Sequence, residues 1–466
     1  MTTPPRQQMG LQCLLVFAQA HEEFRIPEIQ SIAELHGFEV TFPPFPDASR
    51  PFMVLELESE SHARVLAQRC ILVKSVCEFY GRGKTYEELH EQIRKNRERW
   101  SKYTHDTSFK FSISAYNHTI PQRRMKDVIE GFSYMDFRGR IDMHSPEVVL
   151  ACLKNRDKRG TIRHKHEGDG DFEEVFFGRL IEEGTARPLV KTFDVKKRTY
   201  YGNTSMEAEI SLLMANQTLA APGKLIYDPF IGTGSMAYAT HFGAFVFGSD
   251  IDGRQMRGKE KQPGIIRAAA QYGVASRILD LCTFDVTRNP WRCGEMFDAI
   301  ITDPPYGVRA GAKRLGRKAR PDKPPRANPQ SHSSQTTLTT TVHTADHALR
   351  AISLVVDLVL LARYLLRPRG RLVFFLPTVT TSTKRSIYNH AVRGHGGRRE
   401  LAANFGSWGR RLITIRKTTS ERYPPPTFTS AADAPDDGLA HTPAHKDFRE
   451  KYFQGSRNRG RGDAWA

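Results

Sequence analysis

Residues 224–236 read KLIYDPFIGTGSM, an apolar run that ends at an acid and a proline and passes into a loop with two glycines. From here onward, short apolar runs typical of buried strands alternate with helical patterns. The predicted strands are 224–230, 244–250, 279–286, 297–303 and 370–377, and the predicted helices are 235–242, 265–273 and 351–366. This alternation predicts an α/β fold, with a doubly wound and mostly parallel sheet covered by helices on both faces. Ligands of such sheets bind at the carboxyl ends of the strands.

The rest of the chain is less regular. Residues 1–185 mix strand-like alternation with amphipathic helical patterns, so we expect a separate α+β domain or a pair of small domains there. Within it, 137–152 is predicted to form a strand, a proline turn and a second strand. The second domain is expected over 190–420, and its 407–417 stretch is predicted to be a further strand in a hairpin at the edge of the sheet. Two segments have the composition of disordered chain: the basic, low-complexity insertion 310–345, and the linker and tail 421–466.

The composition favours a polyanionic partner. Lys and Arg number 69 against 51 Asp and Glu, a formal charge of +18, which suits nucleic acid, although a basic solubilising surface has the same signature. The six cysteines form no C-x-x-C pair and have no histidines at ligand spacing, so we expect reduced, packed thiols and no metal site. No run of about eighteen uncharged apolar residues and no signal-like segment is present, so we expect no membrane span and a cytoplasmic location.

The glycine loop restricts the kind of ligand that fits there. Gly232 and Gly234 permit a tight turn and a close approach of the backbone to a ligand. A dinucleotide site favours a third glycine where this chain has Ala237, and the Gly-Lys-Ser/Thr of a P-loop is absent, so a phosphate-binding role is disfavoured. Asp228 would repel a pyrophosphate but can accept hydrogen bonds from an ammonium group. A ligand with both an amino group and a carboxylate fits this loop.

Two further acids follow the next two predicted strands. Asp250 ends the strand 244–250, at the position where doubly wound sheets place a carboxylate on ribose hydroxyls. Asp285, near the end of 279–286, could reach an adenine amino group. An amino acid, a ribose and an adenine together describe S-adenosyl-L-methionine, which we expect as the cofactor. The alternative is that each acid only begins a solvated loop.

Residues 297–307, FDAIITDPPYG, end the fourth predicted strand on an acid, two prolines, a tyrosine and a glycine. Because proline has a fixed φ and no N–H, Pro304 and Pro305 force the backbone out of the sheet and leave carbonyls without a ladder partner. Asp303 could accept one N–H of an exocyclic amine on a nucleobase, and the Pro304 carbonyl the other. Tyr306 could stack on a base swung out of its helix. These four residues are the predicted catalytic group, although the same tetrapeptide could simply close a strand.

In this order, the motifs resemble the amino-methyltransferases of the S-adenosylmethionine-dependent, Rossmann-like class. Four stretches resemble more closely the catalytic subunit of the eukaryotic tRNA guanosine N2-methyltransferase that acts at position ten of tRNA: FDVKKRTYYGNTSMEAEISLLMANQ (193–217), IYDPFIGTGSMAYATHFGAFVFGSDID (226–252), FDAIITDPPYGVRAGAKRLG (297–316) and FREKYF (448–453). This resemblance implies a tRNA-binding region of the THUMP type, with its trace in FSYMDFRGRIDMHSPEVV (132–149). It also implies a heterodimer with a small zinc-binding activator subunit, so that any zinc would lie in the partner.

The resemblance also implies that Gly202–Met206, GNTSM, is a loop that packs over the cofactor. Thr204 and Ser205 are then its expected polar contacts, and the alternative is that Ser205 is the N-cap of the helix that follows. Glu207 stands where the family pattern leads us to expect Asp, and Ala268 where Asn is common; these departures bear on details of the cofactor pocket and not on the reaction class.

The function favoured by the sequence is methylation of the exocyclic N2 amine of a guanosine in tRNA. An adenine N6-methyltransferase acting on DNA or RNA would use the same amine geometry without needing an N-terminal tRNA-binding domain. A non-catalytic RNA-binding protein with a methyltransferase fold is the third alternative, opposed by the intact 303–306 motif and the three cofactor acids. The insertion 310–345 either contacts the tRNA backbone or forms a flexible surface.

Overall fold

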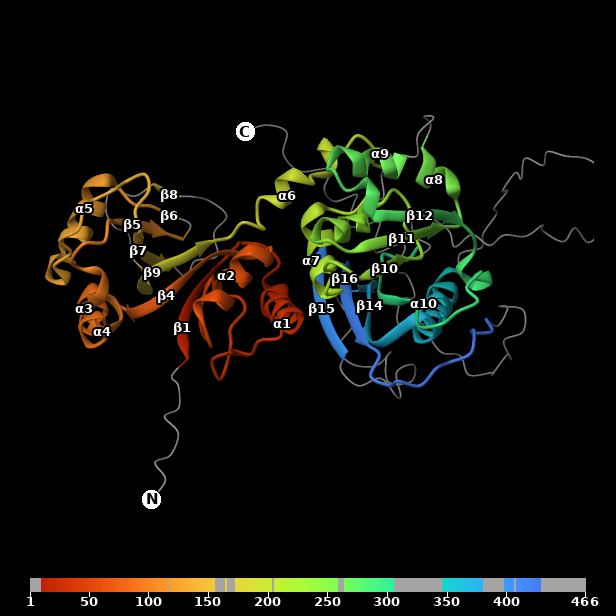
Figure 1. The fold of residues 1–466 in the computed structure, drawn as a ribbon, viewed down its shortest axis with the longest axis horizontal. Helices are drawn as coiled ribbons and strands as arrows, with labels where there is room; N and C mark the ends of the chain where they lie inside the picture. Colours follow the sequence, from red (N-terminus) through yellow and green to blue (C-terminus); the bar gives the residue numbers. More distant parts are fainter. Residues whose placement is uncertain are drawn as a thin grey trace, which may run out of the picture. The chain divides into compact units, whose positions relative to one another are not determined.

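The computed structural model describes residues 10–116, 118–155, 164–165, 172–202, 205–258, 264–305, 346–379, 398–405 and 408–428 (Figure 1). The chain divides into two compact units, Met1–Thr192 (unit 1) and Phe193–Ala466 (unit 2), and each is described by itself. The insertion predicted at 310–345 and the tail beyond residue 428 lie outside the described residues, as do Thr204 and Tyr306.

Unit 1 is built on one sheet with the strand order β2-β3-β1-β4-β9-β7-β5-β6-β8. Its strands are β1 (Leu11–Phe17), β2 (Val40–Thr41), β3 (Phe52–Leu57), β4 (Val73–Gly83), β5 (Phe109–Ala115), β6 (His118–Thr119), β7 (Val148–Asn155), β8 (His164–Lys165) and β9 (Glu174–Glu183). Its α-helices are α1 (Arg25–His36), α2 (Glu60–Arg69), α3 (Tyr86–Lys95), α4 (Arg97–Trp100), α5 (Gln122–Glu130) and α6 (Leu189–Thr192). The α+β architecture predicted for the N-terminal region is therefore confirmed.

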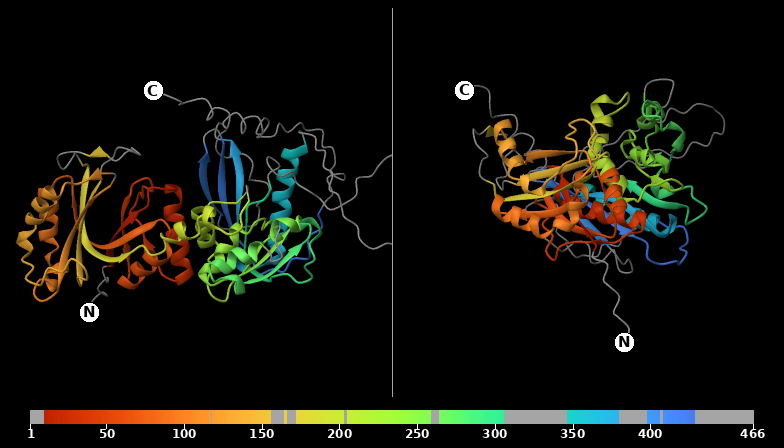
Figure 2. Two further views of the ribbon diagram at one scale, coloured as in Figure 1. Left: turned by 90° about the horizontal axis from the view of Figure 1, so that it is seen from above. Right: turned by 60° about the vertical axis from the view of Figure 1, so that its left-hand side comes forward.

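Strands β4 and β9 are shared by the two halves of unit 1. They pair antiparallel from Ser75↔Glu183 to Gly83↔Val175. Strand β1 pairs with the first part of β4 and β7 with the first part of β9, so the neighbours on the two sides are offset along the sheet. One hydrophobic core contains residues of α1 and α2, and another contains residues of α3 and α5. Figures 1 and 2 show these long strands passing from one half to the other.

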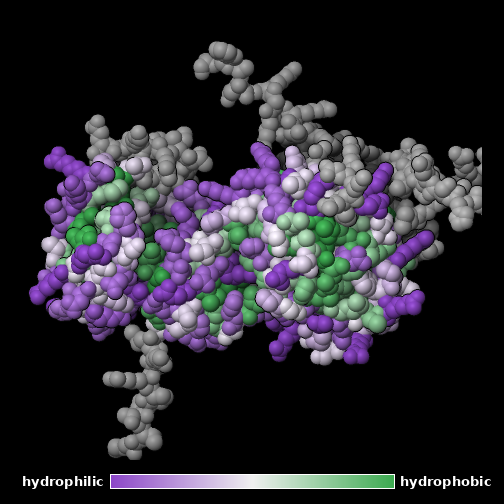
Figure 3. All heavy atoms as spheres, turned by 45° about the horizontal axis from the view of Figure 1, so that its top comes forward, coloured by the Kyte–Doolittle hydropathy of each residue, from purple (hydrophilic) through white to green (hydrophobic). Residues whose placement is uncertain are grey.

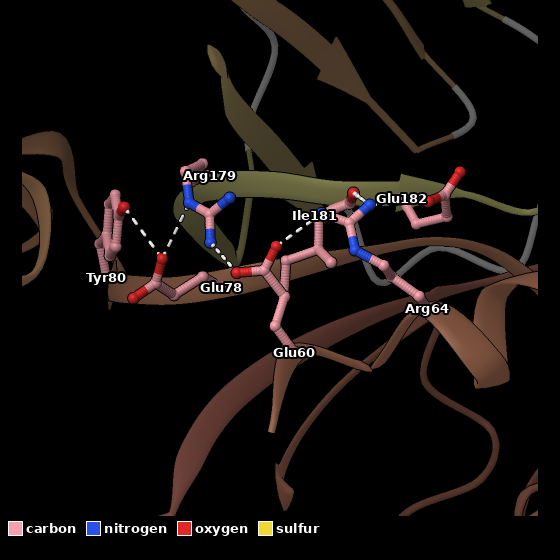
Figure 4. Close-up of polar contacts among 7 residues, drawn as sticks. All are labelled: Glu60, Arg64, Glu78, Tyr80, Arg179, Ile181 and Glu182. Atoms are coloured by element: carbon pink, nitrogen blue, oxygen red, sulfur yellow. Dashed lines mark hydrogen bonds and ion pairs between the residues drawn. The ribbon is translucent and has the colours of Figure 1, made fainter. Parts of the chain in front are cut away.

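A network of ion pairs ties helix α2 to these two strands (Figure 4). The Arg179 guanidinium on β9 donates to Glu78 of β4 at 2.9 Å and to Glu60 of α2 at 2.7 Å. The Tyr80 hydroxyl also donates to Glu78, at 3.2 Å, and Arg64 donates to Glu60 at 2.6 Å. Burial alone would lower the pKa of Arg179, but the bonds to Glu60 and Glu78 outweigh it and raise that pKa. The buried charges are therefore paired, as their desolvation requires.

One predicted strand of unit 1 is wrong. Residues 137–141 join no strand ladder, because the pairing there is only the isolated bridge Phe109↔Ile141. The backbone instead runs as a loop, in which the Arg138 N–H bonds to the Thr104 carbonyl at 2.7 Å. Loop contacts thus take donors that a ladder would have used. The second strand predicted in this segment is present as β7.

Unit 2 contains a second sheet, with the strand order β12-β11-β10-β13-β14-β16-β15. Its strands are β10 (Leu225–Asp228), β11 (Phe245–Asp250), β12 (Ile278–Thr283), β13 (Phe297–Thr302), β14 (Leu366–Val379), β15 (Arg398–Phe405) and β16 (Trp408–Arg416). Its helices are α7 (Ala208–Gln217), α8 (Gly253–Arg257), α9 (Gly264–Gln271) and α10 (Asp346–Leu365), with 3-10 helices η5 (Ser235–Phe242), η6 (Ala275–Arg277) and η7 (Val286–Arg288).

The first five strands in this order are parallel, and β16 and β15 follow as an antiparallel hairpin. This confirms the predicted doubly wound sheet and the hairpin edge at 407–417. The helix predicted at 235–242 is present, but as a 3-10 helix that starts from Gly234 in the left-handed conformation.

The core of unit 2 contains aromatic side chains of neighbouring strands of this sheet. Tyr227 of β10 stacks on Phe297 of β13 with ring centroids 5.0 Å apart, and Trp291 meets both rings edge-on. Residues of β14 and α10 belong to the same core. Because β10, β11, β12 and β13 are parallel, the residues that follow them emerge at the same edge.

Figure 3 shows hydrophilic side chains over much of the visible surface, with hydrophobic ones between them on both units. The large apolar side chains that the described part of unit 2 exposes are Tyr201, Phe245, Leu279 and Val356. No helix in the described ranges is long and apolar enough to cross a membrane.

The cysteines follow the prediction only in part. All six are free thiols, and four of them are buried: Cys13, Cys70, Cys77 and Cys152. Cys282 is half-buried, and the prediction of a packed thiol is wrong for Cys293, which is exposed in the loop before β13. Within the described residues, no cluster of His, Cys, Asp and Glu could hold a metal ion.

Candidate active site

Four carboxylates predicted from the sequence lie after the parallel strands of unit 2. Asp228 and Asp250 are the last residues of β10 and β11, and Asp303 directly follows β13. Strand β12 ends at Thr283, so Asp285 lies two residues beyond its strand. The topology therefore brings all four to the carboxyl edge of the sheet, where ligands of this fold class bind.

Asp228 is the most deeply buried of these acids, with 1% of its surface exposed. Its Oδ1 accepts hydrogen bonds from the Phe230 N–H at 3.0 Å and from the Thr302 hydroxyl at 2.9 Å. Its pKa is raised from the usual 3.8 to about 8, chiefly by burial and in smaller part by the charges of Asp250 and Asp303, while the two hydrogen bonds act to lower it. A cationic ligand group would favour the ionised form, so the site fits an ammonium.

The Asp250 carboxylate accepts a hydrogen bond from the glycine loop. Its Oδ2 accepts the Gly232 N–H at 2.9 Å, and its Oδ1 accepts the Asp252 N–H at 2.8 Å. Gly232 and Gly234 have φ values of 53° and 85°, which side chains rarely adopt. A Cβ on Gly234 would also lie 3.0 Å from Cγ2 of Ile265. Glycine is required there both by the backbone conformation and by the packing of α9.

The hydroxyl of Ser205 anchors the 202–206 loop to the glycine loop. It lies 2.7 Å from the Thr233 hydroxyl and accepts the Gly202 N–H at 2.9 Å. The alternative role as a helix N-cap is wrong, because α7 begins at Ala208 and its N-cap residue is Glu207. A second anchor is the bond from the Met206 N–H to the Ser235 hydroxyl at 2.9 Å.

Asp285 accepts hydrogen bonds from both the N–H and the hydroxyl of Thr287, at 2.9 and 2.8 Å. It is therefore the N-cap of η7, and it is 5% exposed. A local capping role explains its position without a ligand. Its contact with an adenine stays a prediction.

Asp303 opens the Pro-Pro turn after β13 and is partly exposed, as is Pro305, while Pro304 is buried. Its Oδ2 accepts a hydrogen bond of 3.1 Å from Nη1 of Arg410 on β16. The sequence prediction did not include Arg410, because an ion pair between positions 107 residues apart leaves no local pattern.

Two family models match this chain. Residues 11–186 match the model described as Tmrp11 THUMP N-terminal domain, and residues 196–350 match the RMKL-like methyltransferase domain. The protein named tRNA (guanine(10)-N(2))-methyltransferase from Schizosaccharomyces pombe is 33% identical over 94% of this chain and 96% of its own length. The protein of the same name from Saccharomyces cerevisiae is 34% identical over 94% and 98%, and the human one, TRMT11, is 32% identical over 96% and 97%.

The chain belongs to the tRNA (guanine(10)-N(2))-methyltransferase family. The resemblance read from its motifs is therefore confirmed, as are the Rossmann-like methyltransferase fold of unit 2 and the THUMP region of unit 1.

A small pocket of this family member lies beside the glycine loop. Its walls come from the glycine loop and the start of η5, from α9 and the residues after it, and from the segment before α7. The lining residues are Phe193, Arg198, Thr233, Gly234, Ala237, Ile265, Ala268, Ala269, Tyr272 and Val274. None of the four carboxylates is among these described lining residues. Ala268, one of the two departures from the family pattern, is a wall of this pocket and is 6% exposed.

Proposed function

We propose that this chain transfers a methyl group from S-adenosyl-L-methionine to the exocyclic N2 amine of the guanosine at position ten of tRNA. The observation that carries the proposal is the identity of 33% with a protein of that printed activity, over nearly the whole of both chains. The placement of Asp303 at the carboxyl edge of a methyltransferase sheet supports it.

The residues around the glycine loop fit the cofactor. Asp228 suits its ammonium group: burial and two acidic neighbours disfavour the ionised carboxylate, and a nearby positive charge would stabilise it. Gly232 and Gly234 allow its close approach, Asp250 would hold the ribose hydroxyls, and the loop that contains Ser205 would close over it. Asp285 would reach its adenine, and Thr204 would add a polar contact. When bound, S-adenosylmethionine supplies an electrophilic methyl group on a positively charged sulfur.

The catalytic group acts on the amine of the base. The lone pair of an exocyclic amine is delocalised into the ring, so the amine must be oriented before it can react. Asp303 would accept one of its N–H groups and the Pro304 carbonyl the other, which turns the lone pair out of conjugation and stabilises the positive charge that develops on nitrogen. The nitrogen bonds to the methyl carbon as the carbon–sulfur bond breaks, and the methylated nitrogen then releases one proton to solvent. Pro305 fixes the turn that aims this carbonyl, and Tyr306 stacks on the flipped base.

The proposed partners follow from the family and the charge. The THUMP region and the net charge of +18 suit a tRNA held by its backbone and shape. A small zinc-binding activator subunit completes the enzyme as a heterodimer in the cytoplasm, a proposal that rests on the family resemblance.

The test measures transfer of labelled methyl to unmodified tRNA by the full chain purified with the activator, followed by digestion to nucleosides. Label is expected in N2-methylguanosine. Asp303→Asn should lower the rate by roughly 100-fold or more without changing cofactor affinity. Asp298→Asn is the control, because Asp298 lies at the opposite end of the same strand and bonds to the Leu225 N–H.

Each other outcome points to a different reading. Label in N6-methyladenosine would replace this function by the adenine methyltransferase. No transfer, with tRNA still bound, would favour a non-catalytic RNA-binding protein. Equal losses in Asp303→Asn and Asp298→Asn would contradict the catalytic role of Asp303.

A further inference from the structure

The ion pair between Arg410 and Asp303 joins two strands, β16 and β13, that are separated in the sheet by β14. Asp303 follows β13, β13 pairs with β14, and β14 pairs with β16, where Arg410 lies opposite Pro377. The donor and acceptor atoms are 3.1 Å apart, and the two side chains are 21% and 25% exposed.

The direction of the Arg410 side chain is set by packing. Its guanidinium carbon lies 5.0 Å from the centroid of the Phe375 ring, within the range of a cation–π contact. Phe375 belongs to β14 and is 1% exposed, so its ring is fixed in the core. A guanidinium held on a fixed ring loses less side-chain entropy when it pairs with a carboxylate. Arg410 is therefore preorganised to meet Asp303.

Acidic side chains also lie at the edge of the sheet where Asp303 stands. Asp228 from β10 and its neighbour Asp250 from β11 face the same edge, and the charges of Asp250 and Asp303 both act on Asp228. Carboxylates this close disfavour one another's ionised form. Arg410 brings a positive charge from the other side, from β16, and the next residue, Arg411, points to the opposite face of that strand.

We propose that Arg410 is a positioning residue that keeps the Asp303 carboxylate ionised and oriented toward the amine of the substrate base. The inference rests on the proposed function, because Asp303 needs its negative charge to accept an N–H and stabilise the cationic nitrogen. Arg410 itself acts through Asp303 and touches neither the base nor the cofactor.

The test compares the wild type with Arg410→Met, which removes the charge and keeps a side chain that can pack on Phe375, and with Arg410→Lys, which keeps the charge. Single-turnover methyl transfer by the full chain with its activator is measured across pH, and cofactor affinity is measured by calorimetry. The control is Arg367→Met, which breaks the ion pair of 3.3 Å between Arg367 and Asp298 at the other end of β13.

Arg410→Met is expected to lower the rate near neutral pH by about tenfold or more and to move the acidic limb of the rate profile upward by about one pH unit. Part of the lost rate should therefore return at high pH. Arg410→Lys should keep the limb close to that of the wild type, and cofactor affinity and the Arg367→Met profile should be unchanged.

Three results would overturn the proposal: wild-type rates in Arg410→Met, an equal loss of rate at every pH, or the same shift in Arg367→Met. If Arg410→Met did not fold, as judged by thermal unfolding, Arg410→Gln would take its place, and wild-type rates or an equal loss of rate at every pH in that variant would overturn the proposal. A wild type that methylates no tRNA would contradict the proposed function itself, and the role of Arg410 with it.

Discussion

The Thr302 hydroxyl donates a hydrogen bond of 2.9 Å to Oδ1 of Asp228, across the adjacent strands β13 and β10. Both side chains are buried, with 0% and 1% exposed. Because Asp303 follows Thr302 directly, this bond connects the acid proposed to bind the cofactor's ammonium with the turn that carries the proposed catalytic acid. A substitution of Asp228 or of Thr302 should therefore alter both cofactor binding and the position of Asp303.

Asp228 should make the stability of the cofactor-free protein depend on pH. Its pKa is about 8 in the folded chain against an ordinary 3.8, so between these values only the folded chain keeps the proton. The free energy of unfolding should then fall as pH rises from about 4 to 8 and change no further above that. Asp228→Asn keeps acceptors for Phe230 and Thr302 but cannot ionise, so its unfolding temperature should exceed that of the wild type by several degrees at pH 8.

The same variant tests the ammonium contact. Calorimetry should find cofactor affinity at least about tenfold lower in Asp228→Asn, because a charge-assisted hydrogen bond is lost. Binding to the wild type near pH 7 should release protons, measurable in buffers of different ionisation enthalpy. Unchanged affinity, or binding without proton release, would show that the ammonium does not meet Asp228.

Ser205→Ala should weaken cofactor binding without slowing the chemical step. It removes the contact of 2.7 Å with Thr233 and frees the Gly202 N–H, so the 202–206 loop loses an anchor. We expect the cofactor Kd to rise by about tenfold, with kcat preserved at saturating cofactor. Ser211→Ala is the matched control, because the Ser211 hydroxyl bonds to Glu207 at the start of its own helix. A loss of kcat in Ser205→Ala would instead assign that hydroxyl a role in catalysis.

Gly234→Ala should be more harmful than Gly223→Ala, although both glycines have similar positive φ values of 85° and 81°. A Cβ on Gly223 meets nothing within 4 Å, so that variant carries only the backbone strain of about 1 kcal/mol. A Cβ on Gly234 would also press on Ile265 and displace the glycine loop. Chemical denaturation and cofactor titration of both variants would separate strain from packing, and equal effects would rule out the Ile265 contact as a constraint.

Arg179→Met should destabilise unit 1 strongly, because it leaves Glu78 buried without its cation. Loss of one partner of a buried pair costs about 3–5 kcal/mol. Arg138→Met is the control, since the Arg138–Asp136 pair is exposed, at 66% on each side, and its loss should leave stability nearly unchanged. Adding Glu78→Gln to Arg179→Met should recover part of the loss in urea unfolding. No recovery would mean that the packing of the Arg179 stem, and not its charge, supports the fold.

The strand and helix order of unit 2 could be predicted from the sequence because each strand carries its own apolar run and each turn its own breaker. The predicted strand at 137–141 failed because local alternation cannot reveal that the Arg138 N–H bonds to Thr104 instead of to a neighbouring strand. The four acids were predicted from their place after the strands. Their environments were not predictable, because the burial of Asp228 and the capping bonds of Asp285 depend on tertiary packing.

Arg410 illustrates the same limit. Its sequence neighbourhood predicts a strand and nothing else, and its partner lies 107 residues earlier in the chain. Only the order of β13, β14 and β16 in the sheet brings the two together. An ion pair between distant strands is visible in the structure but leaves no motif in the sequence.

Strands β4 and β9 run through both halves of unit 1 and pair with each other over most of their length, with two shifts of register along the way. Two domains joined by a flexible linker can pivot, but two halves that share the same strands cannot turn without breaking ladder bonds. The shared strands therefore fix the distance between the two halves of unit 1. An RNA that touches both halves would therefore meet contact points whose spacing is set by the rise of the strands. A truncation that keeps only one half would divide both β4 and β9.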